Sequence, residues 1–145
     1  MTRGDDRVVL APGTDDNGLA QMLAGLLQQN LVDHPEKERD LARLVGRVAI
    51  VAVDAGVSLT LRFGQGRVTV HDGVFGVPDV TIRAKGDDIM QMSLVELDPR
   101  FRLPDLRKDG AKAMVEASRS GRVQMHGTLT NLPFLLRLTR LMTIY

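Results

Sequence analysis

The sequence contains no cysteine and no tryptophan, and it has one tyrosine and four phenylalanines among 145 residues. Without cysteine, disulfide frameworks, thiolate metal sites and cysteine nucleophiles are all excluded. The scarcity of aromatic side chains leaves few stacking platforms for single-stranded nucleic acid. Lysine and arginine (19) balance aspartate and glutamate (18), so the net charge of +1 gives no reason to expect a nucleic-acid partner.

Long apolar runs are also missing. The first seven residues are mostly polar, and the apolar run over 8–11 is shorter than the roughly 7–15 residues of a signal-peptide core. No stretch approaches the roughly 18 apolar residues that a membrane span requires. We therefore expect a cytoplasmic protein, and the absence of cysteine fits a reducing compartment. The preference for arginine over lysine is typical of a GC-rich bacterial genome.

The composition is that of one globular domain. Apolar residues make up 43% and charged residues 26% of the chain, close to the averages for soluble domains. A chain of this length fits a single domain. We expect an N-terminal tail over 1–13, of which 8–10 could dock onto the domain, and one domain over 14–145 without internal repeats.

The apolar periodicity predicts helices near both ends of the chain. Apolar residues recur every three or four positions between Leu19 and Leu31, and a shorter helix follows Pro35. A last helix is expected over 131–145, because Asn131 and Pro133 are residues typical of a first turn. This last helix carries more apolar surface than packing against one sheet requires.

Between these ends the period changes to two. The run over 48–53 is apolar on both faces, and the segments over 57–63 and 68–71 alternate, which predicts a three-stranded antiparallel meander. The glycines around Gln65 resemble the start of a dinucleotide fingerprint, but they lie between two strands and are interpreted as a hairpin turn. Further strands are expected over 80–83 and 123–126, and helices over 87–94 and 105–120.

None of the common catalytic motifs is present. His71 and Asp72 are neighbours in an expected strand, so their side chains point to opposite faces and do not form a dyad. His126 shares its face with polar neighbours, and the pair at 87–88 begins a helix, where carboxylates complement the macrodipole. We expect a protein without enzymatic activity, bound metal or cofactor.

The apolar residues of the C-terminal half are more informative. Methionine is flexible and polarizable, and it lines adaptable cavities well, although an ordinary methionine-containing core explains the composition equally. An apolar surface with few polar groups is typical of ligand pockets. The methionines concerned are Met90, Met92, Met114, Met125 and Met142.

Three segments, taken in their order, resemble the sterol carrier protein 2 (SCP2) family. They are 59–70 (LTLRFGQGRVTV), 78–82 (PDVTI) with the helix that follows it, and 121–127 (GRVQMHG) leading into the apolar 135–138. The resemblance covers about 41–142 and implies an α/β (α+β) two-layer sandwich, with a five-stranded mixed sheet and helices on one face. It also implies non-catalytic binding, with possible transfer, of a sterol, fatty acyl chain or phospholipid in an apolar cavity, closed by the C-terminal helix.

The resemblance implies an apolar lining drawn from several elements, and parity alone does not say which strand face meets the ligand. The segment over 94–120 is longer and more charged than is usual in the family, which affects the expected cavity entrance. The implied lining residues are Leu59, Leu61, Val68, Val70, Ile82, Ile89, Met90, Leu94, Met114, Val123, Met125, Leu135, Leu138 and Met142.

The expected partner is a lipid or another apolar small molecule, and a monomer is favoured. Arg100, Arg102 and Arg107 could meet phosphate headgroups if the protein approaches a membrane. Two alternatives stay open: an interaction or oligomerisation module that uses the apolar C-terminal helix, and an accessory factor of a lipid or quinone biosynthetic enzyme. A small hydrolase or isomerase using His71, Asp72 or His126 is the least favoured reading.

Overall fold

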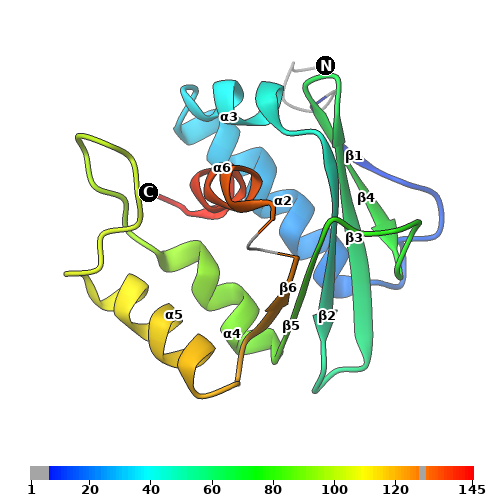
Figure 1. Ribbon diagram of the computed structural model, residues 1–145. Coiled ribbons are helices and arrows are strands. Elements are labelled where there is room, and N and C mark those ends of the chain that lie inside the picture. The colour runs from blue at the N-terminus through cyan, green and yellow to red at the C-terminus, as the bar shows by residue number, and fades with distance from the viewer. Residues whose placement is uncertain (1–6, 128–129) are drawn as a thin grey trace.

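The computed structural model describes residues 7–127 and 130–145, so the first six residues of the expected tail lie outside the described part. A six-stranded mixed sheet forms one layer, and the helices lie together on one of its faces (Figure 1). The strand order is β1-β4-β3-β2-β5-β6. The strands are β1 (Val8–Leu10), β2 (Gly46–Ala52), β3 (Val57–Gly64), β4 (Arg67–Asp72), β5 (Val80–Ala84) and β6 (Gln124–His126).

The helical layer follows the order that the periodicity predicts. The first long helix begins after Asn17, whose side-chain oxygen accepts a hydrogen bond from the Ala20 N–H at 3.0 Å, a standard N-cap. The Asn17 side-chain amide also donates to the Ser58 carbonyl and to Asp72, which ties this helix to the sheet. The helices are α2 (Gly18–Asp33), α3 (Lys37–Arg43), α4 (Gly86–Gln91), the 3-10 turn η1 (Met92–Leu94), α5 (Asp109–Arg119) and α6 (Leu132–Met142).

The predicted meander is confirmed. β2, β3 and β4 pair antiparallel in sequence, and Leu61 lies opposite both Val48 and Val70. β5 then pairs parallel with β2, so the segment over 73–79 must cross the sheet face that carries no helix. The glycines around Gln65 form the turn between β3 and β4, with positive φ at Gln65 and Gly66.

Three expectations need correction. The sheet has six strands and not five, because Val8–Leu10 leaves the expected tail and pairs parallel with β4 as β1. The helix expected from residue 105 begins at Asp109, because Asp105 instead accepts hydrogen bonds from the backbone and side chain of Arg107. The last helix ends at Met142, because Thr143 has an extended backbone.

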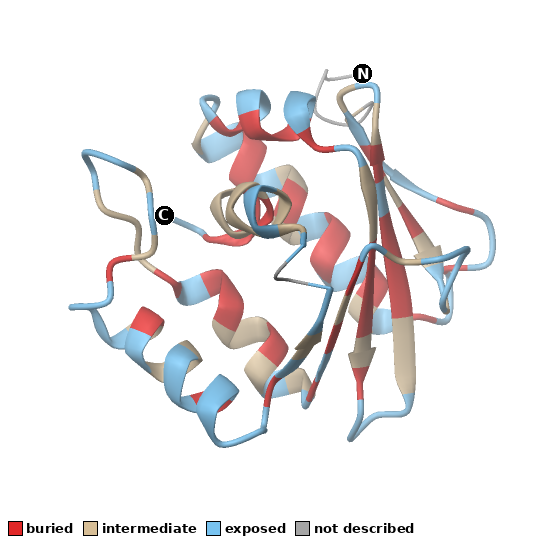
Figure 2. Cartoon of the chain, in the orientation of Figure 1, coloured by how far each residue is buried: buried red, intermediate tan, exposed pale blue. Residues whose placement is uncertain are grey.

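The core lies between the sheet and the helices (Figure 2). α2 packs against β1, β3 and β4 and covers one half of the inner sheet face. The outer face carries polar and basic side chains instead, with Arg62, Arg67 and Arg83 exposed. Within the described residues, no helix is both long and apolar enough to cross a membrane.

Candidate ligand-binding cavity

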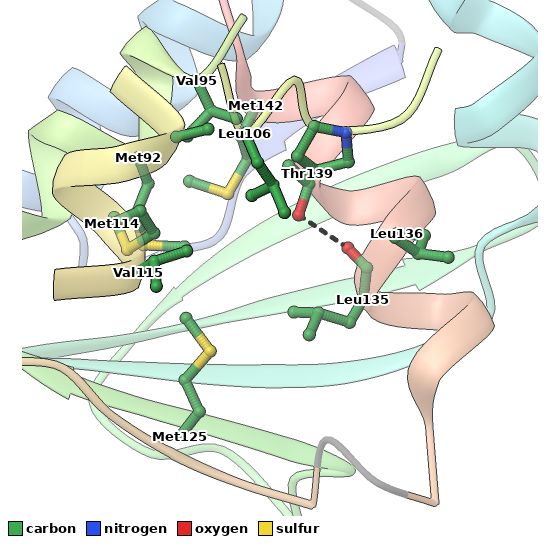
Figure 3. A pocket seen from close by; sticks show the side chains of 12 residues that line it. Met92, Val95, Leu106, Met114, Val115, Met125, Leu135, Leu136, Thr139 and Met142 are labelled. Carbon is green, nitrogen blue, oxygen red and sulfur yellow. Dashed lines mark hydrogen bonds between the residues drawn. The ribbon is translucent and has the colours of Figure 1, made fainter. Parts of the chain in front are cut away.

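An apolar cavity of about 240 Å³ lies where α5, α6, η1 and β6 meet (Figure 3). It is set beside the half of the sheet that α2 leaves uncovered, and α6 forms the wall opposite α5 (Figure 1). The lining comes from four elements and from the segment that joins η1 to α5. The lining residues are Met92, Val95, Pro104, Leu106, Ala111, Met114, Val115, Met125, Leu135, Leu136, Thr139 and Met142.

The lining offers almost no polar group to a ligand. Among the described lining residues, Thr139 carries the only side-chain hydroxyl, and that group donates to the Leu135 carbonyl at 2.9 Å, one turn back in α6 (Figure 3). Burying a polar ligand group without a hydrogen-bond partner costs about 1–3 kcal/mol in proteins. The cavity therefore suits a hydrocarbon segment and not a polar headgroup.

Four methionines give the cavity an adaptable wall. Met92, Met114, Met125 and Met142 come from η1, α5, β6 and α6, and Figure 3 shows them converging on the same space. Unbranched thioether side chains change rotamer at low cost and fill irregular gaps. The volume is a little below the roughly 300–1,000 Å³ of sites for drug-sized ligands, and rotamer changes of the methionines would alter it.

The segment over 95–108, here called the mouth segment, borders the cavity with Val95, Pro104 and Leu106. An isolated antiparallel bridge between Leu97 and Pro104 closes it into a loop. Its Leu106 side chain lies in the lining although the residue as a whole is 62% exposed. The mouth segment therefore supplies both a wall of the cavity and an apolar rim.

Ion pairs hold the mouth segment against the helices. The nearly buried Asp40 of α3 lies 3.3 Å from the Arg102 guanidinium and 3.6 Å from that of Arg140 in α6. Arg140 also donates to the Arg102 carbonyl at 2.8 Å. Within the segment, hydrogen bonds from Arg107 lower the pKa of Asp105 to about 2. Two of the three arginines expected to meet headgroups thus have carboxylate partners.

A sequence comparison decides the family. The sequence profile of the SCP-2 sterol transfer family matches residues 19–101, which run from α2 into the mouth segment. The chain belongs to this family. No protein among the curated sequences matches the chain, so the family assignment rests on the profile.

Solved structures support the fold of this SCP-2 family member. The "UbiJ-SCP2 Ubiquinone synthesis protein" matches with a TM-score of 0.59 and 18% identity, over 85% of this chain and 90% of that chain. The "Crystal structure of sterol carrier protein 2" matches with a TM-score of 0.51 and 14% identity, over 87% and 92%. At these identities the likeness concerns the fold.

The profile match and the cavity overlap only partly. Residues 19–101 include Met92 and Val95, whereas the remaining lining residues follow Phe101 in the chain. The family match therefore covers the meander, β5 and the first helices, and the greater part of the cavity wall comes from the C-terminal third of this SCP-2 domain.

Four of the residues expected to line a cavity come together in this one. They are Met114, Met125, Leu135 and Met142, from α5, β6 and α6. The strand residues Leu59, Leu61, Val68, Val70 and Ile82 are fully buried in the core and do not line it, and α2 packs over the β3 and β4 members of this set. Of the others, Ile89, Val123 and Leu138 are buried core residues, Met90 packs against the core, and Leu94 is exposed in part.

The lining residues implied by the family resemblance leave out most of the residues that the mouth segment and the first turns of α5 contribute to the cavity wall. Val95 and Pro104 show neither a helical nor a strand period, because they belong to a loop, and Leu106 was expected in the helix over 105–120 but lies in the same loop. Ala111 and Val115 belong to α5, which mixes small apolar residues with charged ones, so only their position beside Met114 marks them. Met92, Leu136 and Thr139 complete the set that the implied lining left out.

Two buried polar side chains fix the carbonyl end of α6. The last carbonyls of a helix have no partner within it and must find donors elsewhere. The Asn30 amide of α2 donates to the Leu141 and Met142 carbonyls, each at 3.0 Å. The fully buried Lys37 ammonium of α3 donates to the Arg140 carbonyl at 2.7 Å and to the Thr143 carbonyl. The cavity wall formed by α6 is therefore held by α2 and α3.

Lys37→Met is expected to lower the free energy of unfolding at pH 7 by about 1–2 kcal/mol. Two buried carbonyl oxygens lose their donor, and the loss of the buried charge offsets only part of this cost. Chemical denaturation monitored by circular dichroism measures the change. Lys112→Met, at an exposed position of α5, is the matched control and should leave stability unchanged.

The same pair of variants should show a pH dependence. Desolvation, more than the nearby Arg102 charge, lowers the pKa of Lys37 to about 8 from the usual 10.5. Between these values the unfolded chain binds a proton that the folded chain has released, so stability rises with pH by about 1 kcal/mol per unit. The neutral amine keeps two N–H groups for its two carbonyls. From pH 8 to 10, the free energy of unfolding of the wild type should therefore rise by this amount per pH unit relative to that of Lys37→Met. Parallel plots of the free energy of unfolding against pH for the two proteins would contradict this prediction.

Asp40→Asn should loosen the mouth segment. The amide removes the charge that pairs with Arg102 and Arg140, and we expect a loss of about 1 kcal/mol, because both arginines remain partly solvated. Backbone amides over 98–104 should then exchange with deuterium several times faster, as measured by mass spectrometry. Glu38→Gln, which breaks the exposed pair with Arg7, should leave exchange in this segment as in the wild type.

Proposed function

We propose that this SCP-2 family protein binds a lipid non-catalytically by enclosing an apolar segment of it in the cavity between α5 and α6, and that it transfers the lipid between sites. The observation that carries the proposal is the lining, which is almost entirely apolar and rich in methionine, with its hydroxyl already bonded. The family's description as a sterol transfer family supports lipid as the ligand class.

An acyl chain fits the described lining better than a sterol. The hydroxyl of a sterol needs a hydrogen-bond partner once it is buried, and the lining residues provide no free side-chain donor or acceptor. An acyl chain meets this wall with methylene groups alone and leaves its headgroup at the exposed rim near Leu106. Each buried methylene then contributes about 0.8 kcal/mol.

Mass spectrometry of organic extracts from the purified protein tests the proposal directly. We expect stoichiometric lipid with at least one acyl chain, and micromolar binding of a fluorescent fatty acid. A fluorescent sterol should bind more weakly than the fatty acid, and the reverse order would assign the cavity to sterols. An extract without lipid, together with no binding of either probe, would show that the proposal is wrong.

A second candidate is an accessory protein of lipid or quinone biosynthesis that presents its apolar surface to a partner. Its support is the exposed apolar side chains of the mouth segment, Phe101, Leu103 and Leu106, and the description of one structural neighbour as a ubiquinone synthesis protein. Deleting α6 does not test this, because Leu138 and Leu141 are core residues. Phe101→Ser is the better variant: loss of a partner with lipid binding intact favours this second function.

Arg100 is the arginine of the mouth segment that suits contact with membrane headgroups. Among the described residues it has no ion pair, and its guanidinium lies 5.2 Å from the centre of the exposed Phe101 ring. An arginine beside an exposed aromatic ring matches the boundary between headgroups and acyl chains. We expect lipid transfer to be carried out by a cytoplasmic monomer. This monomer would contact membranes transiently through the mouth segment.

A further inference from the structure

Three arginines form a groove on the outer face of the sheet, the face without helices. Arg47 of β2 lies directly opposite Arg62 of β3, and Arg62 lies opposite Thr69 of β4. Arg67 is two residues before Thr69 and therefore shares its face. Side chains directly opposite or diagonal in such a pairing lie within reach of one another. Together the three arginines, here called the arginine groove, line a depression of about 540 Å³.

Among the described residues, the arginine groove carries net positive charge, with three guanidiniums and the carboxylate of Asp79. The five ion pairs among the described residues involve other cations, so none of the three guanidiniums has a carboxylate partner there. Asp79 is the acidic residue of the lining, and one of its oxygens accepts from the Arg47 backbone N–H at 2.9 Å. Like charges directly opposite in a strand pair are destabilising, and Arg47 lies opposite Arg62 in this way, so an anion bound between them would relieve the repulsion.

The loop that crosses the outer face holds one of these cations in place. The Arg47 guanidinium lies 5.7 Å from the centre of the Phe75 ring, which stacks on His71 at 4.1 Å. A Cβ at Gly76 would lie only 2.8 Å from an Arg47 terminal nitrogen, so this glycine allows the loop to close over the side chain. An arginine fixed before binding loses less conformational entropy when an anion arrives.

The field of the groove reaches the neighbouring histidine. Burial lowers the pKa of His71, and the charges of Arg62 and Arg47 lower it further. The lowered pKa favours the neutral imidazole, so the positive charge at this site comes from the arginines. The helices lie on the other face of the sheet (Figure 1), and the groove and the apolar cavity share no lining residue, so an occupant of the groove is separate from the ligand of the cavity.

We propose that the arginine groove binds the phosphate or diphosphate group of a second ligand. The planar guanidinium forms two parallel hydrogen bonds to a phosphate, and a cluster from three adjacent strands matches the several oxygens of a diphosphate. The phosphate can belong to a soluble molecule or to a lipid headgroup, since the recognised chemistry is the same. This site goes beyond the proposed lipid-binding function and does not depend on it.

Calorimetric titration with inorganic pyrophosphate at constant ionic strength tests the site. The double variant Arg62→Gln/Arg67→Gln should bind at least about tenfold more weakly than the wild type, because charged hydrogen bonds are lost. Both residues are exposed, so the fold should survive, and Arg67→Gln alone serves if the double variant does not fold. Arg83→Gln, on the same face of β5 but outside the groove, is the matched control and should bind like the wild type.

Three results would overturn the proposal: no pyrophosphate binding by the wild type, equal binding by the double variant, or equal weakening in Arg83→Gln. The last would show a general positive field and not a site. Vesicles of phosphatidylcholine with and without phosphatidic acid identify the source of the phosphate. Capture by phosphatidic acid that requires Arg62 and Arg67 supports a headgroup, whereas pyrophosphate binding without capture supports a soluble ligand. Neither result depends on lipid in the cavity.

Discussion

Leu135→Glu should weaken the binding of a fluorescent fatty acid by about 100-fold. Leu135 lies in the wall that α6 gives to the cavity, and its side chain is directed into the space shared with Met125 and Met114 (Figure 3). A carboxylate there must either lose its hydration when a chain enters or keep water in the cavity. A cost of about 2–3 kcal/mol corresponds to the stated loss of affinity.

Leu132→Glu is the matched control for this variant. Leu132 is in the first turn of the same helix, is 51% exposed and does not line the cavity, so its carboxylate stays in water near the helix N-terminus. Affinity should therefore stay within about twofold of the wild type. If both variants lose affinity equally, or neither does, the lipid does not occupy this cavity.

Acidification should partly restore binding to Leu135→Glu. Burial in apolar surroundings raises the pKa of a carboxyl group, and the protonated form carries no charge into the cavity. The affinity of this variant should rise between pH 7 and pH 5 while that of the wild type changes little. An unchanged ratio over this range would indicate that the substitution acts by distorting α6, and circular dichroism would then be expected to show it.

Gly110→Ala should lower the free energy of unfolding by about 3 kcal/mol and disturb the cavity. Gly110 is in the first turn of α5, where an added Cβ would lie 2.1 Å from the Leu94 carbonyl oxygen and 2.9 Å from its carbon. These are backbone atoms at the end of η1, so neither element can yield by a rotamer change. Alanine favours a helix over glycine by about 1 kcal/mol, which is less than the cost of this overlap.

Gly25→Ala separates the helix preference of alanine from the steric overlap of an added Cβ. Gly25 is in the middle of α2, and no atom lies within 4 Å of an added Cβ, so the helix preference acts alone. Urea denaturation should show this variant more stable than the wild type by up to about 1 kcal/mol, and Gly110→Ala less stable. Because Ala111 and Met114 follow Gly110 in the wall, fatty acid affinity should also change in Gly110→Ala only. Equal stability of the two variants would contradict the close approach of α5 to η1.

Much of the fold follows from local patterns. The alternation over 57–63 and 68–71 predicts β3, β4 and their antiparallel pairing, because a strand with one buried face must place every second residue inside. α2 and α6 follow from the helical spacing of their leucines and from Asn17, Asn131 and Pro133. The strand β1 has only three residues, too few to show a period of its own, so its pairing with β4 depends on the sheet already being there.

The cavity could be predicted only in part. Met114, Met125, Leu135 and Met142 were expected to line a ligand site and lie together around this cavity, and their contact with a ligand stays a prediction. Leu59 and Val70 were equally good candidates for the lining by their sequence pattern, but they lie in the core. Which helix covers a strand face decides where its side chains are buried, and the strand pattern does not give this. Lys37 gives the clearest case: a lysine is ordinarily exposed, and only the end of α6 provides the carbonyls that hold this one inside.

The sequence by itself determined the class of this protein: a mixed α/β fold of the SCP2 type, apolar at its C-terminal end and without any common catalytic motif. Periodicity and turn residues carry that information, because they act between neighbours in the chain. The tertiary structure decided where the ligand space lies and which residues surround it. Cavities and charged clusters form between elements far apart in sequence, so the lining of the cavity and the meeting of Arg47, Arg62 and Arg67 appear only when the sheet and helices assemble.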